Sequence, residues 1–201
     1  MLSENERAYL ELGGVNYFCD VYLNGEHMGQ ARGTDNVAVF DVTSALRTAQ
    51  ENTLVLRLVM PSGEETAFSI KGKHLATPYE YPYIQQVPLL YVKPAVSVSE
   101  TLITADLDGS VTAAVTLSNA TDAAQSVRLS GRITPNKRDE SLDFEWMSIS
   151  VPPGETDAVL HFTVKNPALW SPDAPNLYRL KLTAEAEDLG TIDESDETFG
   201  F

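Results

Sequence analysis

Apolar and polar residues alternate with a period of two along most of this chain. The pattern is clearest in residues 53–59, where every second residue is leucine, and it returns in 111–117, 127–133, 158–164 and 178–184. Successive side chains of a β-strand point to opposite faces, so each segment predicts a strand with one buried and one solvent-facing side. Strands of this kind build two-layer antiparallel sandwiches. We therefore predict an all-β fold.

Turn sequences lie between the predicted strands. Asn24-Gly25 predicts a type I′ hairpin, because both central residues of that turn need a positive φ, and Asp108-Gly109 predicts a second hairpin of the same kind. Pro152-Pro153-Gly154 separates two further strands. The best helix candidate is 41–47, one or two turns long and capped by Asp41 or Thr43.

One predicted strand changes its parity. Phe144 and Trp146 share one face, whereas Ile149 and Val151 fall on the other. A single inserted residue repairs such a slip, so we predict a β-bulge near Met147.

The composition limits the partners and the chemistry. Fourteen Lys and Arg against 29 Asp and Glu give a net charge of −15, which repels nucleic-acid phosphates and anionic lipid surfaces, and we predict neither as a partner. Cys19 is the single cysteine and has no partner for an internal disulfide. His27, His74 and His161 lack the spacing of metal ligands. We predict no metal site and no cofactor.

The chain divides into two parts at Lys93-Pro94. Residues 94–201 hold about seven regular strands, which predicts an immunoglobulin-like sandwich. Residues 1–93 hold five or six strands and start directly in one, at 8–12. We expect this first part to lack partner strands that precede Met1, and therefore to expose an edge that favours a homo-oligomer.

Two passages carry recognisable motifs. The first contains Gly14–Tyr17 ("GV-x-Y"), Val21–Gly25 ("V-x-LNG"), Phe40–Thr43 ("F-D-[IV]-T") and Glu51–Leu54 ("EN-x-L"). The second is NPALWSPDAPNLY at residues 166–178, followed by Phe199-Gly200-Phe201 at the end of the chain. Both resemble family 2 glycoside hydrolases, the group of β-galactosidases, β-glucuronidases and β-mannosidases. The resemblance implies a partial jelly-roll, sugar-binding-like domain over 1–93 and an immunoglobulin-like β-sandwich over 94–201.

The resemblance also implies a retaining glycosidase whose two glutamates lie on a (β/α)₈ barrel. Such a barrel takes about 250 residues and holds its two carboxyl groups about 5–5.5 Å apart, and neither its length nor its pattern occurs here. We predict no catalytic residue in this chain. The predicted function is the non-catalytic N-terminal portion of a family 2 enzyme, shaping the sugar pocket and bracing the barrel of the parent β-glycosidase. The alternative is a stand-alone carbohydrate-binding or scaffold module without enzyme activity. The sequence does not assign a compartment: we expect a periplasmic or secreted protein if the parent is a bacterial polysaccharide-degrading enzyme, and a cytoplasmic one otherwise.

The chain departs from the family motifs at two places. Relatives carry a "G-G-Y-x-x-F" loop where this chain reads Gly33–Phe40, and Gln86 stands where relatives have an arginine. Binding groups often sit in loops at the end of a rigid sheet. If any residues here reach a carbohydrate, we expect them to be Arg32, Asp35 and Asn36 in this polar loop.

The remaining conspicuous residues have structural interpretations. Trp170 and Tyr178 lie between prolines and are expected to close the end of the sandwich, while Asp41 and Thr43 are expected to cap a local turn. The acidic clusters at 185–188 and 193–197 are typical of solvated strand edges. Asn119-Ala120-Thr121 matches the glycosylation pattern.

Overall fold

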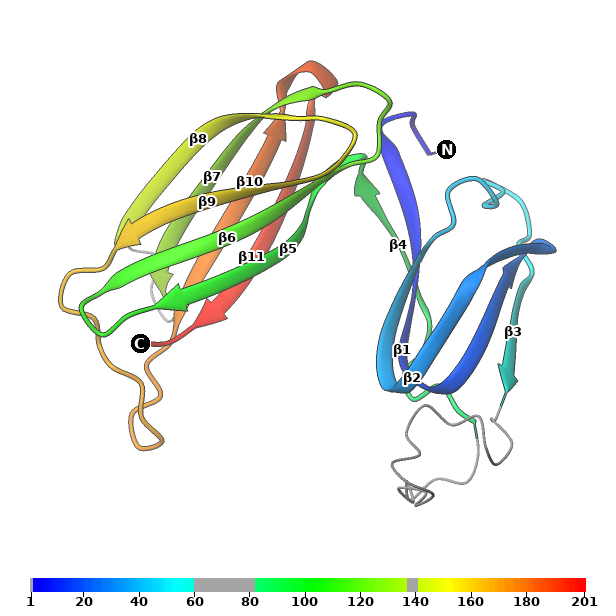
Figure 1. Ribbon diagram of the computed structural model, residues 1–201, viewed down its shortest axis with the longest axis horizontal. Coiled ribbons are helices and arrows are strands. Elements are labelled where there is room, and N and C mark those ends of the chain that lie inside the picture. The colour runs from blue at the N-terminus through cyan, green and yellow to red at the C-terminus, as the bar shows by residue number, and fades with distance from the viewer. Residues whose placement is uncertain (1, 60–81, 137–140) are drawn as a thin grey trace, which may run out of the picture. The chain divides into compact units, whose positions relative to one another are not determined.

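The computed structural model describes residues 2–59, 82–136 and 141–201. Within them the chain forms eleven β-strands and one 3₁₀ turn, Glu187–Leu189. The strands fall into two compact units, Met1–Ser3 with Arg7–Val92, and Glu4–Glu6 with Lys93–Phe201 (Figure 1). No helix in these described ranges is long and apolar enough to cross a membrane. The predicted all-β fold is confirmed.

The described residues of the first unit form one sheet around a long central strand. β1 (Glu6–Leu23) pairs antiparallel with β2 (Glu26–Asp41) and β3 (Leu54–Val59), and it also pairs with β4 (Leu89–Pro94). The predicted strand at 8–12 and the predicted strand that leads into the Asn24-Gly25 hairpin are the two halves of β1. The described part of the unit has four strands, and the predicted count of five or six also includes residues 60–81, which lie outside the described residues.

A bulge bends β1 at Gly13-Gly14, where the register with β2 slips on either side of Val15. Gly14 has a φ of +68°, and a Cβ on it would lie 2.5 Å from the Cβ of Gln85. The backbone N–H groups of Gln85 and Gln86 donate to the carbonyls of Gly14 and Gly13 at 3.1 and 3.0 Å. Residues 85–86 pass so close to the backbone of β1 here that a side chain at residue 13 or 14 would collide with them. Glycine is therefore needed at both positions.

The turns of the first unit agree with the sequence. Asn24 (φ +53°) and Gly25 (φ +89°) form the predicted I′ hairpin between β1 and β2. Residues 42–46 make one turn, in which the Leu46 N–H donates to the Val42 carbonyl at 3.0 Å. Asp41 accepts from the Thr43 N–H and Thr43 accepts from the Ala8 N–H, each at 2.9 Å. Asp41 is a local cap, as predicted, whereas the Thr43 hydroxyl caps no local turn but ties this segment to the start of β1.

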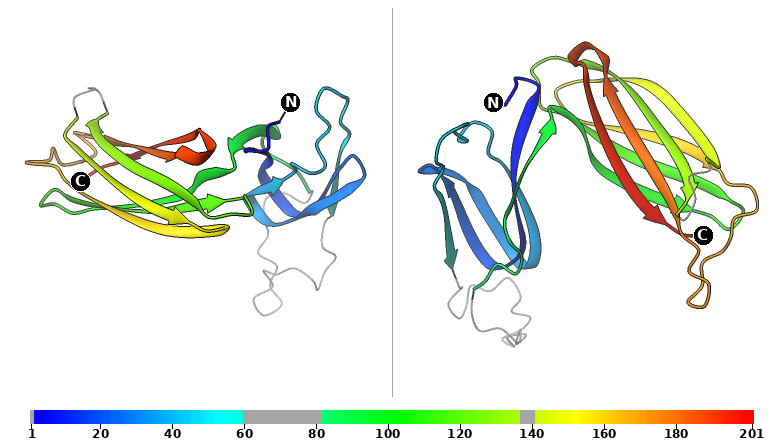
Figure 2. Two further views of the ribbon diagram at one scale, coloured as in Figure 1. Left: turned by 90° about the horizontal axis from the view of Figure 1, so that it is seen from above. Right: turned by 180° about the vertical axis from the view of Figure 1, so that it is seen from behind.

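The second unit is a sandwich of seven strands. Their bounds are β5 (Val96–Ala105), β6 (Ser110–Asn119), β7 (Gln125–Pro135), β8 (Asp143–Val151), β9 (Gly154–Thr163), β10 (Tyr178–Ala186) and β11 (Thr191–Phe199). One sheet has the order β5-β6-β9 and the other β11-β10-β7-β8. The first sheet faces the viewer in Figure 1, and the opposite view in Figure 2 brings β10 and β11, in orange and red, to the front. The alternating apolar residues of both sheets meet in one core, which confirms the immunoglobulin-like sandwich.

The hairpin between β5 and β6 differs in detail from its prediction. Gly109 has a φ of +93°, but Asp108 has no positive φ, and the strand pairing ends at Ala105 with Val111. The connection is therefore longer than a two-residue I′ turn. The Ser110 N–H donates to the Asp108 carboxylate at 2.9 Å and lowers the pKa of that group. Asp108 thus belongs to the turn itself.

The predicted bulge at Met147 is wrong. β7 and β8 stay in continuous register from Gln125–Val151 to Ile133–Asp143. The parity slip arises because Phe144 and Trp146 face outward, with exposed fractions of 44% and 54%. The Arg132 and Arg128 guanidinium groups lie 5.9 and 5.1 Å from the centres of these two rings. Cation–π contact makes exposed aromatic side chains acceptable on this face.

The end of the sandwich is closed by Tyr178, as expected. Its side chain is buried against the rings of Phe199 and Phe201, and its hydroxyl accepts from the Ala168 N–H at 2.7 Å. Trp170 does not close the core, because the residue is 49% exposed. Only its backbone is fixed to the end of the chain, where the Trp170 backbone N–H donates to the Phe201 carbonyl at 2.8 Å.

Candidate functional site

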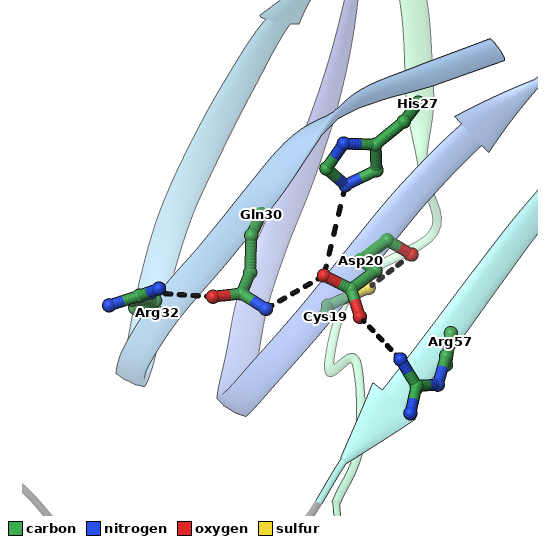
Figure 3. Close-up of polar contacts among 6 residues, drawn as sticks. All are labelled: Cys19, Asp20, His27, Gln30, Arg32 and Arg57. Atoms are coloured by element: carbon green, nitrogen blue, oxygen red, sulfur yellow. Dashed lines mark hydrogen bonds and ion pairs between the residues drawn. The ribbon is translucent and has the colours of Figure 1, made fainter.

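A cluster of polar side chains lies on the outer face of the first unit's sheet, centred on Asp20 of β1 (Figure 3). Alternation along β1 turns Cys19 and Val21 into the apolar core and Asp20 to the opposite face. The Asp20 side chain is nevertheless well covered, and the whole residue is only 8% exposed. A carboxylate this buried requires hydrogen-bonded or charged partners.

The partners of Asp20 come from both neighbouring strands. Gln30 of β2 and Arg57 of β3 are its register partners on either side. The Gln30 Nε2 donates to Asp20 Oδ1 at 2.7 Å, and the Arg57 Nη1 donates to Oδ2 at 3.2 Å. His27 Nε2 lies 3.8 Å from Oδ1 and its ring centre lies 4.9 Å from that of Tyr22. Asp20 therefore holds three strands together on the face that the core does not use.

Arg32 extends this network toward solvent. Its Nε donates to the Gln30 Oε1 at 2.6 Å, and its guanidinium lies 5.8 Å from the centre of the Phe18 ring, its cross-strand partner. Within the described ranges its two terminal nitrogens make no hydrogen bond. The side chain is exposed yet fixed at its base, which leaves a planar pair of donors for a ligand.

The other two predicted residues lie near Arg32 but not in a loop. Asp35 and Asn36 belong to a bulged stretch of β2 that remains paired with the bulge of β1. The Asn36 Nδ2 donates to the Arg32 carbonyl at 3.0 Å, and the Tyr83 hydroxyl donates to Asp35 Oδ1 at 2.7 Å. Asp35 has a φ of +56°, a backbone conformation that Asn and Asp adopt more readily than most residues. The structure therefore brings Asn36 to Arg32 and directs Asp35 to Tyr83.

The cluster is suited to binding and not to nucleophilic chemistry. Burial raises the pKa of the Cys19 thiol, and the Asp20 carboxylate raises it further, so the thiol stays protonated and unreactive. Among the described residues no group of three or more His, Cys, Asp or Glu is arranged to hold a metal. What remains is a set of fixed donors and acceptors beside aromatic rings, the kind of surface that hydrogen-bonds to hydroxyl-rich ligands.

Sequence reasoning missed Asp20, Gln30 and Arg57. A signal was present for Asp20 and Arg57, because each is a charged residue within an otherwise apolar strand, but Gln30 lies in a mostly polar stretch and gave none. The meeting of Asp20 with Gln30 depends on a slip in the β1–β2 register between Tyr22 and Val21, whereas Arg57 reaches Asp20 through the unshifted β1–β3 register. A hairpin without that slip would place Asp20 opposite Gly29.

Two family models match the chain. One, described as "Glycosyl hydrolase 2 galactose-binding domain-like", covers residues 1–126, and the other, "Glycosyl hydrolases family 2", covers residues 92–201. The chain belongs to glycoside hydrolase family 2.

The relatives of this family 2 chain are much longer than it is. A β-galactosidase of Clostridium acetobutylicum is 25% identical over 201 residues, which span 98% of this chain and 21% of the relative. A β-glucuronidase of Bacteroides fragilis is 30% identical over 54 residues, 27% of this chain and 8% of the relative. The solved β-glucuronidase of Bacteroides uniformis matches with a TM-score of 0.82 and 18% identity, over all of this chain and 25% of that one. At this identity the likeness shows the fold alone.

Replacing Asp20 tests whether it organises the polar face of this family 2 chain. In Asp20→Asn the side-chain NH₂ group would face an N–H donor of Gln30 or Arg57, so one hydrogen bond is replaced by a donor–donor contact. The ion pair between Asp20 and Arg57 is also lost. We expect the free energy of unfolding of the first unit to fall by about 1–3 kcal/mol. The exposed Glu26→Gln, in the same hairpin, is the control and should change it by less than about 0.5 kcal/mol.

Cys19 supplies the measurement, because it is the one cysteine of the sequence and is fully buried in the first unit. Its rate of labelling by a thiol reagent in rising urea reports the opening of this unit. Equal labelling rates in Asp20→Asn and Glu26→Gln would show that Asp20 has no organising role.

Proposed function

We propose that this chain is the non-catalytic front portion of a family 2 glycosidase, and that the face around Arg32 forms one wall of the enzyme's sugar pocket. The observation that carries the proposal is the fixed base and unused terminal nitrogens of Arg32 within the described residues. A positioned guanidinium offers two parallel donors to the hydroxyl or carboxyl oxygens of a sugar. Asp35 and Asn36 contribute at the rim of the same face.

The proposal assigns one task to each part of the chain. Residues 1–93 act as the sugar-binding-like domain, and residues 94–201 act as an immunoglobulin-like brace for the catalytic barrel, which is the proposed partner. Support comes from the family membership and from two relatives that contain a matching segment within a much longer chain. The reaction proposed for the parent is hydrolysis of O-glycosyl bonds.

Calorimetry of the 201-residue chain with simple β-glycosides tests the assisting role. One wall of a pocket offers too few contacts for tight binding, so we expect a dissociation constant of about 1 mM or weaker. Micromolar affinity without a barrel would overturn the assisting role.

Arg32→Ala in the enzyme encoded by the complete reading frame tests the pocket wall directly. We expect KM to rise about tenfold with kcat nearly unchanged, because Arg32 would bind the ground state and the transition state alike. Arg47→Ala is the control, since Arg47 is an exposed arginine outside the Asp20 network. An unchanged KM in Arg32→Ala would remove Arg32 from the pocket.

A stand-alone carbohydrate-binding or scaffold module is the second candidate. The altered Gly33–Phe40 stretch and Gln86 favour it, because Gln86 packs against Gly13 where relatives have an arginine. Reading the gene beyond the codon for Phe201 separates the two candidates. A continuing β/α pattern with two glutamates supports the enzyme, and further sandwiches or a stop codon support the module.

Sedimentation at high concentration tests the self-association expected of the first unit.

A further inference from the structure

The outer face of the sheet β11-β10-β7-β8 carries a second group of exposed side chains, remote in sequence from the Asp20 network. Register places Arg132 of β7 between Phe144 of β8 and Lys181 of β10, and it places Ser130 beside Thr183 of β10 in the adjacent row. All of these residues point away from the core by strand parity.

These side chains surround a hollow of about 240 Å³, whose walls are Arg132, Lys181, Phe144 and Glu194. Ser130 and Thr183 contribute small hydroxyl-bearing side chains between the walls. One six-membered sugar ring fits a space of this order. The hollow therefore has cationic donors, an aromatic side, hydroxyls and a carboxylate acceptor within one small volume.

The cations at this hollow are held differently from each other. Lys181 Nζ lies 2.8 Å from Glu194 Oε1 and so forms an ion pair. The Arg132 guanidinium stacks on Phe144 and, within the described residues, pairs with no carboxylate. The guanidinium carbon lies 5.9 Å from the centre of the Phe144 ring, and a guanidinium has five N–H donors, two of which can bind an anion bidentately. In a chain of net charge −15, Arg132 is thus a cation with no carboxylate partner among the residues that the structure describes.

We propose that this hollow binds an acidic saccharide unit, one that carries a carboxylate or sulfate group. Arg132 takes the anionic group, Phe144 contacts the apolar side of the ring, and Glu194 accepts hydrogen bonds from ring hydroxyls. Glu194 favours a glycan over an acidic peptide side chain, because the sugar carries hydroxyl donors beside its anionic group and an acidic side chain carries none. The site is independent of the pocket wall proposed around Arg32.

Arg128 provides a matched control for the test. It also stacks on an exposed aromatic ring of β8, that of Trp146, but it does not line the hollow. If the stacked pairs only stabilise the sheet, Arg132→Gln and Arg128→Gln should behave alike. If the hollow binds an acidic sugar, the two variants should differ in affinity and agree in stability.

The experiment is calorimetry of the 201-residue chain with tetragalacturonate, with cellotetraose as the neutral saccharide and a short oligoglutamate as the acidic peptide. We expect binding of tetragalacturonate alone, weakened by added salt, reduced about tenfold or more in Arg132→Gln and retained in Arg128→Gln. Equal loss in both variants, binding of oligoglutamate as tight as that of the sugar, or no binding of tetragalacturonate would each overturn the proposal. Arg32→Ala should leave this binding unchanged, so its result is separate from that of the pocket wall.

Discussion

Gly109→Ala should destabilise the sandwich by about 3–5 kcal/mol. Two costs add at this position. Gly109 has a φ of +93°, which strains any residue with a Cβ, and the added Cβ would collide with the backbone carbonyl oxygen of Val164. That carbonyl cannot rotate away as a flexible side chain does, and the Val164 N–H is already bonded to the Gly109 carbonyl at 2.8 Å. The change therefore also disturbs the junction between the β5–β6 turn and the end of β9.

Gly154→Ala is the matched control. Gly154 lies in the same unit with a φ of +102°, but no atom among the described residues lies within 4 Å of the place that a Cβ would take there. We expect it to cost about 1–2 kcal/mol, the backbone strain alone. Both tryptophans of the sequence, Trp146 and Trp170, belong to the sandwich unit, so tryptophan fluorescence during urea unfolding reports this unit selectively. Equal losses in the two variants would mean that the Val164 contact has no energetic role.

Asn119→Ala should cost the same unit about 2–4 kcal/mol. The Asn119 side chain is 2% exposed at the end of β6 and makes four hydrogen bonds. Its Nδ2 donates to the carbonyls of Ala123 and Val151 at 2.9 and 2.8 Å, and its Oδ1 accepts from the N–H and the hydroxyl of Thr121 at 2.9 and 2.7 Å. Val151 ends β8 in the opposite sheet, so the amide ties the two sheets together. Alanine would leave buried carbonyls without donors.

Two further variants sharpen this test. Ser118→Ala, at the preceding residue on the other face of β6, should change stability by less than about 0.5 kcal/mol. Asn119→Asp should be at least as damaging as Asn119→Ala, because a carboxylate would face the two carbonyl oxygens. A stable Asn119→Asp would contradict the donor role of Nδ2.

The same burial explains why the Asn119-Ala120-Thr121 pattern is not an accessible glycosylation site in the folded chain.

Part of the candidate site followed from the sequence and part did not. Arg32 was predicted because it is a charged residue near a family motif that this chain has altered. Its supports, Gln30 and Asp20, were not predicted, and the assumed loop proved to be a bulged stretch of β2. In the second unit, the outward Phe144 and Trp146 suggested a bulge because their stacked arginines lie on another strand.

The sequence by itself determined the all-β class, the seven-strand sandwich, the Asn24-Gly25 hairpin and the family, because period-two alternation, turn residues and motifs are local properties of the chain. Only the tertiary structure decided which side chains meet across strands. A single register slip after the hairpin sets Asp20 against Gln30 and Phe18 against Arg32. Such a slip reflects how two segments pair in space, and a one-residue change in pairing replaces every cross-strand neighbour while leaving the local pattern unaltered.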